Sequence, residues 1–125
     1  MIIGMVMSQD KETIVPIIEG SIARIYNTVT EESEDFTNPA MGLKEGRRGA
    51  AITWMLKQGV ETLCAPPSTL CELSYEKAQE EQLHFYRLEP GTTFAEFQAQ
   101  LQKGKLNLQE SLPDEEIEPS NPPAK

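Results

Sequence analysis

The sequence contains few of the side chains on which most metal and redox sites depend. It has two cysteines and one histidine among its 125 residues. Two cysteines are far too few for a disulfide scaffold, and a reduced pair is more often free thiol or ligand than bridge. A lone histidine such as His84, which has Phe85 and Tyr86 beside it, is more often structural than ligating.

Basic residues and long hydrophobic runs are scarce as well. The chain carries 20 acidic residues against 11 basic ones, a formal net charge of -9. This field repels a phosphate backbone, so we expect no nucleic-acid partner. No apolar run approaches 18 residues, and the apolar stretch at residues 1–7 is too short for a membrane span or a leader. We therefore expect a cytoplasmic protein with no membrane partner.

Familiar catalytic signatures are missing too. The chain has no Gly-Lys-Ser/Thr sequence and no Gly-x-Gly-x-x-Gly sequence, which excludes a Walker A loop and a dinucleotide fingerprint. The first apolar segment, residues 2–7, lacks the carboxylate that a two-metal nuclease would need. No serine lies in a nucleophile context. The sequence therefore predicts a protein that is not an enzyme.

What is present is an alternation of short strands and helices. Hydrophobic periodicity predicts strands at residues 2–7, 22–29, 34–38, 60–65 and 83–88. It predicts helices from about 47 to 58, from 69 to 82 and from 93 to 103, the last two opening with capping-box spacings at Thr69–Glu72 and Thr93–Glu96. Residues 13–20, punctuated by proline and glycine, are expected to form an unusually apolar loop.

This order of elements predicts an α/β fold. An antiparallel opening followed by two helix-to-strand crossovers gives a five-stranded mixed sheet in the order 3-2-1-4-5, with helices on both faces. We expect one domain over residues 1–108. Residues 109–125 hold four prolines, five acids and only two large apolar residues, a composition typical of a disordered acidic tail.

A glycine-spaced basic loop before the first helix is the strongest candidate for a binding site. At a helix N-terminus, free amides, the positive end of the dipole and nearby cations can together hold an anion. We therefore take Lys44, Gly46, Arg47, Arg48 and Gly49 as candidate anion-binding residues. The alternative is a flexible, solvated connection with no ligand.

Three sulfur-containing side chains lie near this loop or at a strand end. Cys64 closes the predicted strand at 60–65, and Cys71 lies at the start of the next helix, where the dipole favours a thiolate. Met41 stands in the glycine loop itself. Burial in the core is the alternative for both cysteines and for the methionine.

Over residues 1–108 the chain resembles the dinitrogenase iron-molybdenum cofactor biosynthesis family. The resemblance is carried by residues 2–7, Asn38-Pro39-Ala40, Gly46-x2-Gly49-Ala50-Ala51, residues 57–63, residues 86–93 and residues 104–106. It implies a ribonuclease H-like three-layer fold. It also implies a protein that binds or carries iron–sulfur or iron-molybdenum clusters.

The chain departs from this family at its ligands. Many members of the family have a Pro-His-Phe-Gly-like segment before the second strand, where this chain has residues 16–20 without a histidine. The family's histidine- and glycine-rich loop is replaced here by residues 41–46. If a cluster is bound, Cys64, Cys71 and Met41 are the remaining candidate metal ligands, and soft thiolates suit iron–sulfur or copper-type metals.

Two functions from different classes remain open. The first is a non-enzymatic carrier or accessory protein for an iron–sulfur or iron-molybdenum type cluster. Lys44, Arg47 and Arg48 would offset the cluster's negative charge, and Cys64 is the leading candidate for a soft ligand. Its partners would be cluster donor or acceptor proteins, and the protein would be a monomer or weak dimer. The second is a divergent member without metal that acts as a protein interaction or regulatory domain, with the apolar loop 14–18 as a contact patch.

Overall fold

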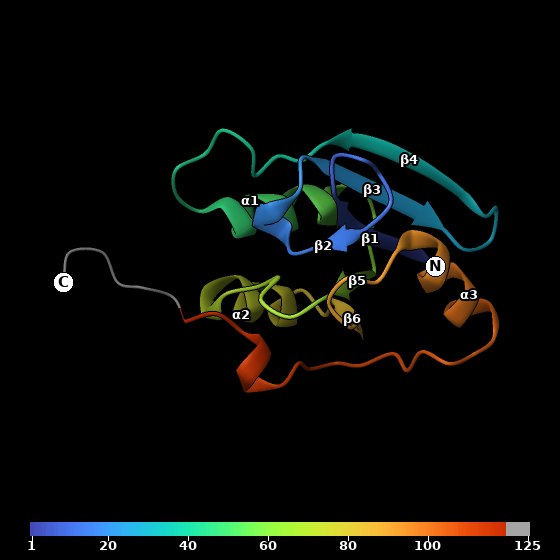
Figure 1. Cartoon of the computed structure of the whole chain (residues 1–125). Helices are drawn as coiled ribbons and strands as arrows, with labels where there is room; N and C mark the ends of the chain where they lie inside the picture. The colour runs from blue at the N-terminus through green and yellow to red at the C-terminus, as the bar shows by residue number, and fades with distance from the viewer. Residues whose placement is uncertain (120–125) are drawn as a thin grey trace.

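The computed structural model describes residues 1–119, and residues 120–125 lie outside the described part. The strands are β1 (Ile2–Met7), β2 (Ile14–Val15), β3 (Ile22–Asn27), β4 (Glu32–Thr37), β5 (Thr62–Ala65) and β6 (His84–Arg87). The helices are α1 (Arg47–Lys57), α2 (Glu72–Glu80) and α3 (Phe94–Gln102), with short 3-10 turns η1 (Ile17–Glu19) and η2 (Asp114–Glu116). Figure 1 shows their arrangement. Among residues 1–119, no helix combines the length and apolar character that a membrane span requires.

The strands form one mixed sheet along the path β4-β3-β1-β5-β6, with β2 attached to β1. β1, β3 and β4 pair antiparallel, whereas β5 is parallel to both β1 and β6. The prediction of a five-stranded sheet is wrong, because the sheet has a sixth strand, β2. Because β5 pairs with β1 only at Ile3 and Gly4, the rest of that edge is open, and residues 14–15 pair there with Val6 and Met7.

The sheet separates two hydrophobic clusters. One contains buried residues of α1 and α2, and the other contains Phe97 of α3, so helices lie on both faces. Successive residues of a strand point to opposite faces. In β5, Leu63 and Ala65 join the α1/α2 cluster, and Cys64 joins the α3 cluster.

The ends of the helices test the predicted caps. At α3 the prediction is confirmed, because the Thr93 hydroxyl accepts from the Glu96 amide at 3.1 Å and the Glu96 carboxylate accepts from the Thr93 amide at 2.9 Å. At α2 the prediction is wrong, because the helix begins after Cys71. The Thr69 hydroxyl instead accepts a buried hydrogen bond from the Ile17 amide at 3.0 Å.

The apolar loop is part of the core. Ile14 and Ile17 are 1% and 0% exposed, and Val15 and Ile18 are half-buried against the core. Little of the predicted contact patch at residues 14–18 is therefore available to a partner. The side chain of Asn38 is hydrogen-bonded to this segment. Its Nδ2 donates to the carbonyls of Ile17 and Gly20 at 2.7 and 2.8 Å. Its Oδ1 accepts from the Ala40 amide at 3.0 Å. The fully buried Asn38 side chain thus holds η1 together with the Thr69 hydroxyl.

The predicted disordered tail also needs correction. Gln109 and Phe85 exchange two backbone hydrogen bonds of 2.8 and 2.9 Å, and Leu112 is buried. In Figure 1 the segment after α3 runs back past β6 towards α2. Residues 109–119 therefore belong to the domain, and the prediction of disorder for residues 120–125 lies outside the described part. The amino-acid composition of residues 109–125 predicted disorder because composition carries no information about which backbone groups are hydrogen-bonded.

Candidate functional site

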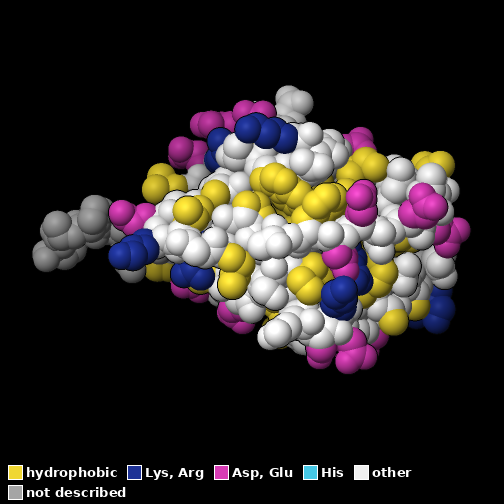
Figure 2. All heavy atoms as spheres, turned by 90° about the horizontal axis from the view of Figure 1, so that it is seen from above, with side chains coloured by type: hydrophobic (Ala, Val, Ile, Leu, Met, Phe, Trp, Pro, Cys, Tyr) yellow, Lys and Arg dark blue, Asp and Glu magenta, His cyan; other side chains and the backbone are white. Residues whose placement is uncertain are grey.

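An open depression of about 610 Å³ lies between the start of α1 and the start of α2. It is lined by Ile18, Lys44, Glu45, Gly46, Arg47, Arg48, Gly49, Cys71, Leu73, Ser74, Lys77 and Pro119. We call it the cationic depression, because four of these residues are basic and one is acidic in a chain whose net charge is -9. On the face shown in Figure 2, acidic side chains lie mostly around the edge, with a few nearer the middle, and basic ones form a few separate groups.

The N-terminus of α1 contributes free amides to this depression. Gly46 is the N-cap, in a left-handed conformation with φ of 66°, and it supplies no capping side chain. The first turn contains no acidic residue, and the amide of Ala50 bonds to the Gly46 carbonyl at 2.9 Å. The amides before Ala50 precede the helical hydrogen-bond ladder, and the dipole adds positive potential there.

The two arginines are held by backbone carbonyls. Arg47 Nη2 donates to the Ile18 carbonyl at 3.2 Å, and Arg48 Nη2 donates to the Ser68 carbonyl at 3.4 Å. The Nε atom of each arginine is buried and has no hydrogen-bond partner among the described residues. A buried donor without an acceptor is costly. The two guanidinium groups line the depression, so an anion there would offset both of their charges.

Cys71 brings a thiol to the same depression. It is the half-buried N-cap of α2, and its backbone amide donates to the Ser74 hydroxyl at 2.9 Å. Its Sγ lies 3.2 Å from the same hydroxyl oxygen. The structure thus places Cys71 with Lys44, Gly46, Arg47, Arg48 and Gly49, as the candidate site requires.

Cys64 lies elsewhere, and its prediction as a ligand beside the arginines is wrong. It is 2% exposed within the α3 cluster, on the opposite face of the sheet from α1. Burial raises the pKa of the Cys64 thiol well above its ordinary value, which keeps it protonated. A neutral thiol among hydrocarbon side chains is a core residue.

Met41 does not join the site either. It is 49% exposed and is not among the residues that line the depression. Within residues 1–119, no three His, Cys, Asp or Glu side chains converge as a metal ion would require. Of the three predicted sulfur ligands, Cys71 alone lies with the basic loop.

Sequence reasoning missed the contribution of α2 beyond Cys71. Ser74 and Lys77 follow Cys71 at intervals of three residues and line the same depression. Residues three apart lie on the same side of a helix. The spacing from Cys71 was therefore a usable signal once the start of α2 was known.

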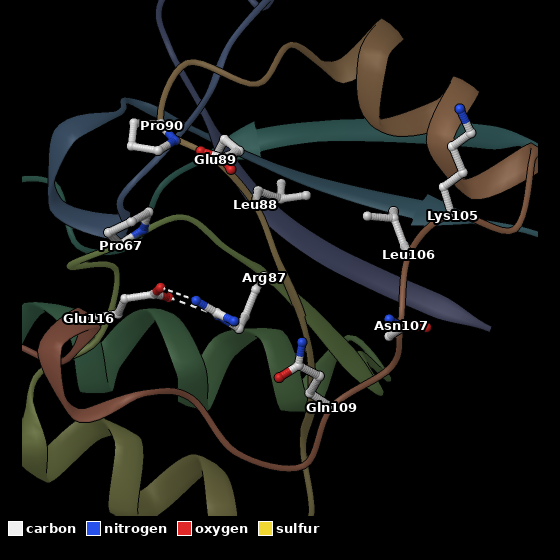
Figure 3. Close-up of a pocket in the computed structure, with 10 residues that line it drawn as sticks. All are labelled: Pro67, Arg87, Leu88, Glu89, Pro90, Lys105, Leu106, Asn107, Gln109 and Glu116. Atoms are coloured by element: carbon white, nitrogen blue, oxygen red, sulfur yellow. Dashed lines mark hydrogen bonds and ion pairs between the residues drawn. The ribbon is translucent and has the colours of Figure 1, made fainter.

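A second hollow, of about 270 Å³, lies at the carboxyl ends of β5 and β6 (Figure 3). Ligands of open α/β sheets usually bind at such ends. Here, however, Arg87 is already paired with the carboxylate of Glu116, with Nε 3.2 Å from Oε1. The lining also contains one further basic residue, Lys105, and one further acidic residue, Glu89. The balanced charge makes this hollow a poorer anion site than the cationic depression.

Comparison with known proteins identifies the fold. No family model matches the chain, and no curated protein matches it. The apo form of the orange protein from Desulfovibrio gigas superposes with a TM-score of 0.72 at 14% identity, covering 86% of this chain and 91% of that one. The chain has the fold of the orange protein. A candidate NifB protein from Thermotoga gives a TM-score of 0.64 at 20% identity, covering 91% of this chain and 97% of that one.

Proposed function

We propose that this protein is a non-enzymatic carrier or accessory protein for an anionic metallocluster of iron–sulfur or iron-molybdenum type. The observation that carries the proposal is the cationic depression, where four basic side chains and one thiol surround two helix N-termini. The fold shared with a candidate NifB protein supports the resemblance to the iron-molybdenum cofactor family and its ribonuclease H-like class. The partners would be cluster donor and acceptor proteins.

The depression fits a preformed cluster better than one built on protein ligands. Protein-bound iron–sulfur clusters are held by several thiolates, commonly four, whereas Cys71 is the one cysteine in the lining. A cluster that keeps its own sulfides needs charge compensation and hydrogen-bond donors. Lys44, Arg47, Arg48 and Lys77 supply the charge, and the first-turn amides of α1 supply donors.

An anaerobic titration tests this function directly. Tetrathiomolybdate serves as a molybdenum–sulfide anion, and sulfate serves as a hard anion of the same charge. We expect visible absorbance to co-elute with the protein in gel filtration, and the affinity to fall as salt screens the cations. Absence of co-eluting absorbance for tetrathiomolybdate and for added iron–sulfur or iron-molybdenum cluster, even at low salt, would remove the proposal.

The role of the thiol is tested by a matched pair of substitutions. Cys71→Ser is expected to weaken tetrathiomolybdate binding by up to about 10-fold while leaving sulfate binding unchanged, because the polarisable Cys71 sulfur packs more favourably against the sulfides of the anion than a hydroxyl does. Serine is a good N-cap residue, so α2 should persist. Cys64→Ser, on the other face of the sheet, should leave both affinities unchanged. Equal binding by wild type and Cys71→Ser would restrict the site to charge recognition.

A further inference from the structure

The C-terminal segment, residues 114–119, reaches the cationic depression at its last residue. The Glu118 amide donates to the Leu70 carbonyl at 2.9 Å, and the Glu118 carbonyl accepts from the Glu72 amide at 2.9 Å. The next residue, Pro119, lines the depression. Figure 1 shows this end of the chain lying beside α2. The segment that sequence composition assigned to a tail therefore borders the proposed site.

Ser68 connects this segment to Arg48. Its amide donates to the Glu116 carbonyl at 2.9 Å, and its hydroxyl donates to Glu118 Oε2 at 2.6 Å. On its other side, the Ser68 carbonyl accepts from Arg48 Nη2 at 3.4 Å. Ser68 has a φ of 71°, a left-handed conformation that a non-glycine residue keeps only where its surroundings hold it.

We propose that Glu118 is a positioning residue of the anion site, acting through Ser68 on Arg48. The Glu118 carboxylate accepts a hydrogen bond from the Ser68 hydroxyl. This fixes the Ser68 backbone so that its carbonyl can accept a hydrogen bond from the Arg48 guanidinium. The inference rests on the proposed function, because it assumes that Arg48 faces a bound anion. It has an unusual consequence: a negatively charged side chain beside the depression strengthens the binding of an anion.

The sign of the effect separates positioning from plain electrostatics. If Glu118 acted through its charge, its removal would tighten anion binding, since like charges repel. If it acts through Ser68, Glu118→Ala should weaken tetrathiomolybdate binding by about 3- to 10-fold, the range of one hydrogen bond. Glu118→Gln keeps an oxygen acceptor without the charge, so its affinity should stay within about twofold of wild type or exceed it.

The control and the second variant come from the same region. Glu115→Ala removes a charge from an exposed position of η2 that makes no hydrogen bond among the described contacts, and it should leave binding unchanged or slightly tighter. Ser68→Gly suits the left-handed backbone and lacks the hydroxyl. It should match Glu118→Ala, and it tests the proposal independently if Glu118→Ala lowers the melting temperature.

A double-mutant cycle with Arg48 decides the mechanism. In an Arg48→Gln background, Glu118→Ala should cause no further loss of tetrathiomolybdate affinity, because the two residues act on one interaction. Additive losses, or binding by Glu118→Ala as tight as wild type or tighter, would overturn the inference and leave the proposed function standing. Absence of binding by the wild-type protein would overturn both.

Discussion

Arg47→Glu is expected to weaken tetrathiomolybdate binding by about 100-fold, because each of the two unit charges altered is worth at least about 1.4 kcal/mol at contact distance in a partly solvated site. Arg47 lies in the first turn of α1 and lines the cationic depression. The substitution removes a cation and sets an anion beside the helix amides. Isothermal titration of the anaerobic protein measures the change.

The matched control lies on the same helix. Lys57 is the basic residue of the last turn of α1, at the other end from the depression, so Lys57→Glu makes the same change in net charge. Its effect on tetrathiomolybdate affinity should be no more than about twofold, because salt screens the interaction between residue 57 and an anion at the other end of the helix. Similar losses in the two variants would mean that net charge, and no defined site, governs binding. Undiminished binding by Arg47→Glu would remove Arg47 from the site.

Asn38→Ala is expected to lower the free energy of unfolding by about 3–5 kcal/mol, because three buried hydrogen bonds lose a partner that nothing replaces. Asn38 is fully buried and bonds the carbonyls of Ile17 and Gly20 and the amide of Ala40. Urea denaturation gives the value. Because η1 carries the Ile18 carbonyl that accepts from Arg47, the variant should also bind tetrathiomolybdate more weakly.

Asn27→Ala is the control for this effect. Asn27 Oδ1 accepts from the amides of Val29 and Thr30 in an exposed turn, where water can replace the lost bonds. Its removal should cost about 1 kcal/mol or less. Equal losses for the two asparagines would show that the buried network around Asn38 is not what holds η1 in place.

Local signals in the sequence predicted the elements well. The Thr93 and Glu96 cap of α3 depends on residues three apart, and the structure confirms it. β2 was missed because two residues pair with β1 only where β5 leaves its edge free. The cap at Thr69 failed because its hydroxyl is used by Ile17, 52 residues away in the sequence. Neither partner is visible in a local window.

Only the part of the candidate site that depends on local sequence was predicted correctly. The basic loop and Cys71 flank two helix N-termini, so helix chemistry alone brought them into consideration. Cys64 was misplaced because every residue of β5 is buried, and a strand buried on both faces gives no alternation from which to read direction. Packing between distant segments decides which face of the sheet α1 covers. In the structure Leu63 lies on that face, and Cys64 lies on the opposite one.

Mapping the bound anion by amide chemical shifts tests the central claim most directly. On addition of tetrathiomolybdate to uniformly labelled protein, the largest shifts are expected at the amides of residues 46–50 and 71–74, which begin α1 and α2 beside the cationic depression. Shifts centred instead on residues 87–90 and 105–109, around the hollow in Figure 3, or no saturable shifts at all, would contradict the account.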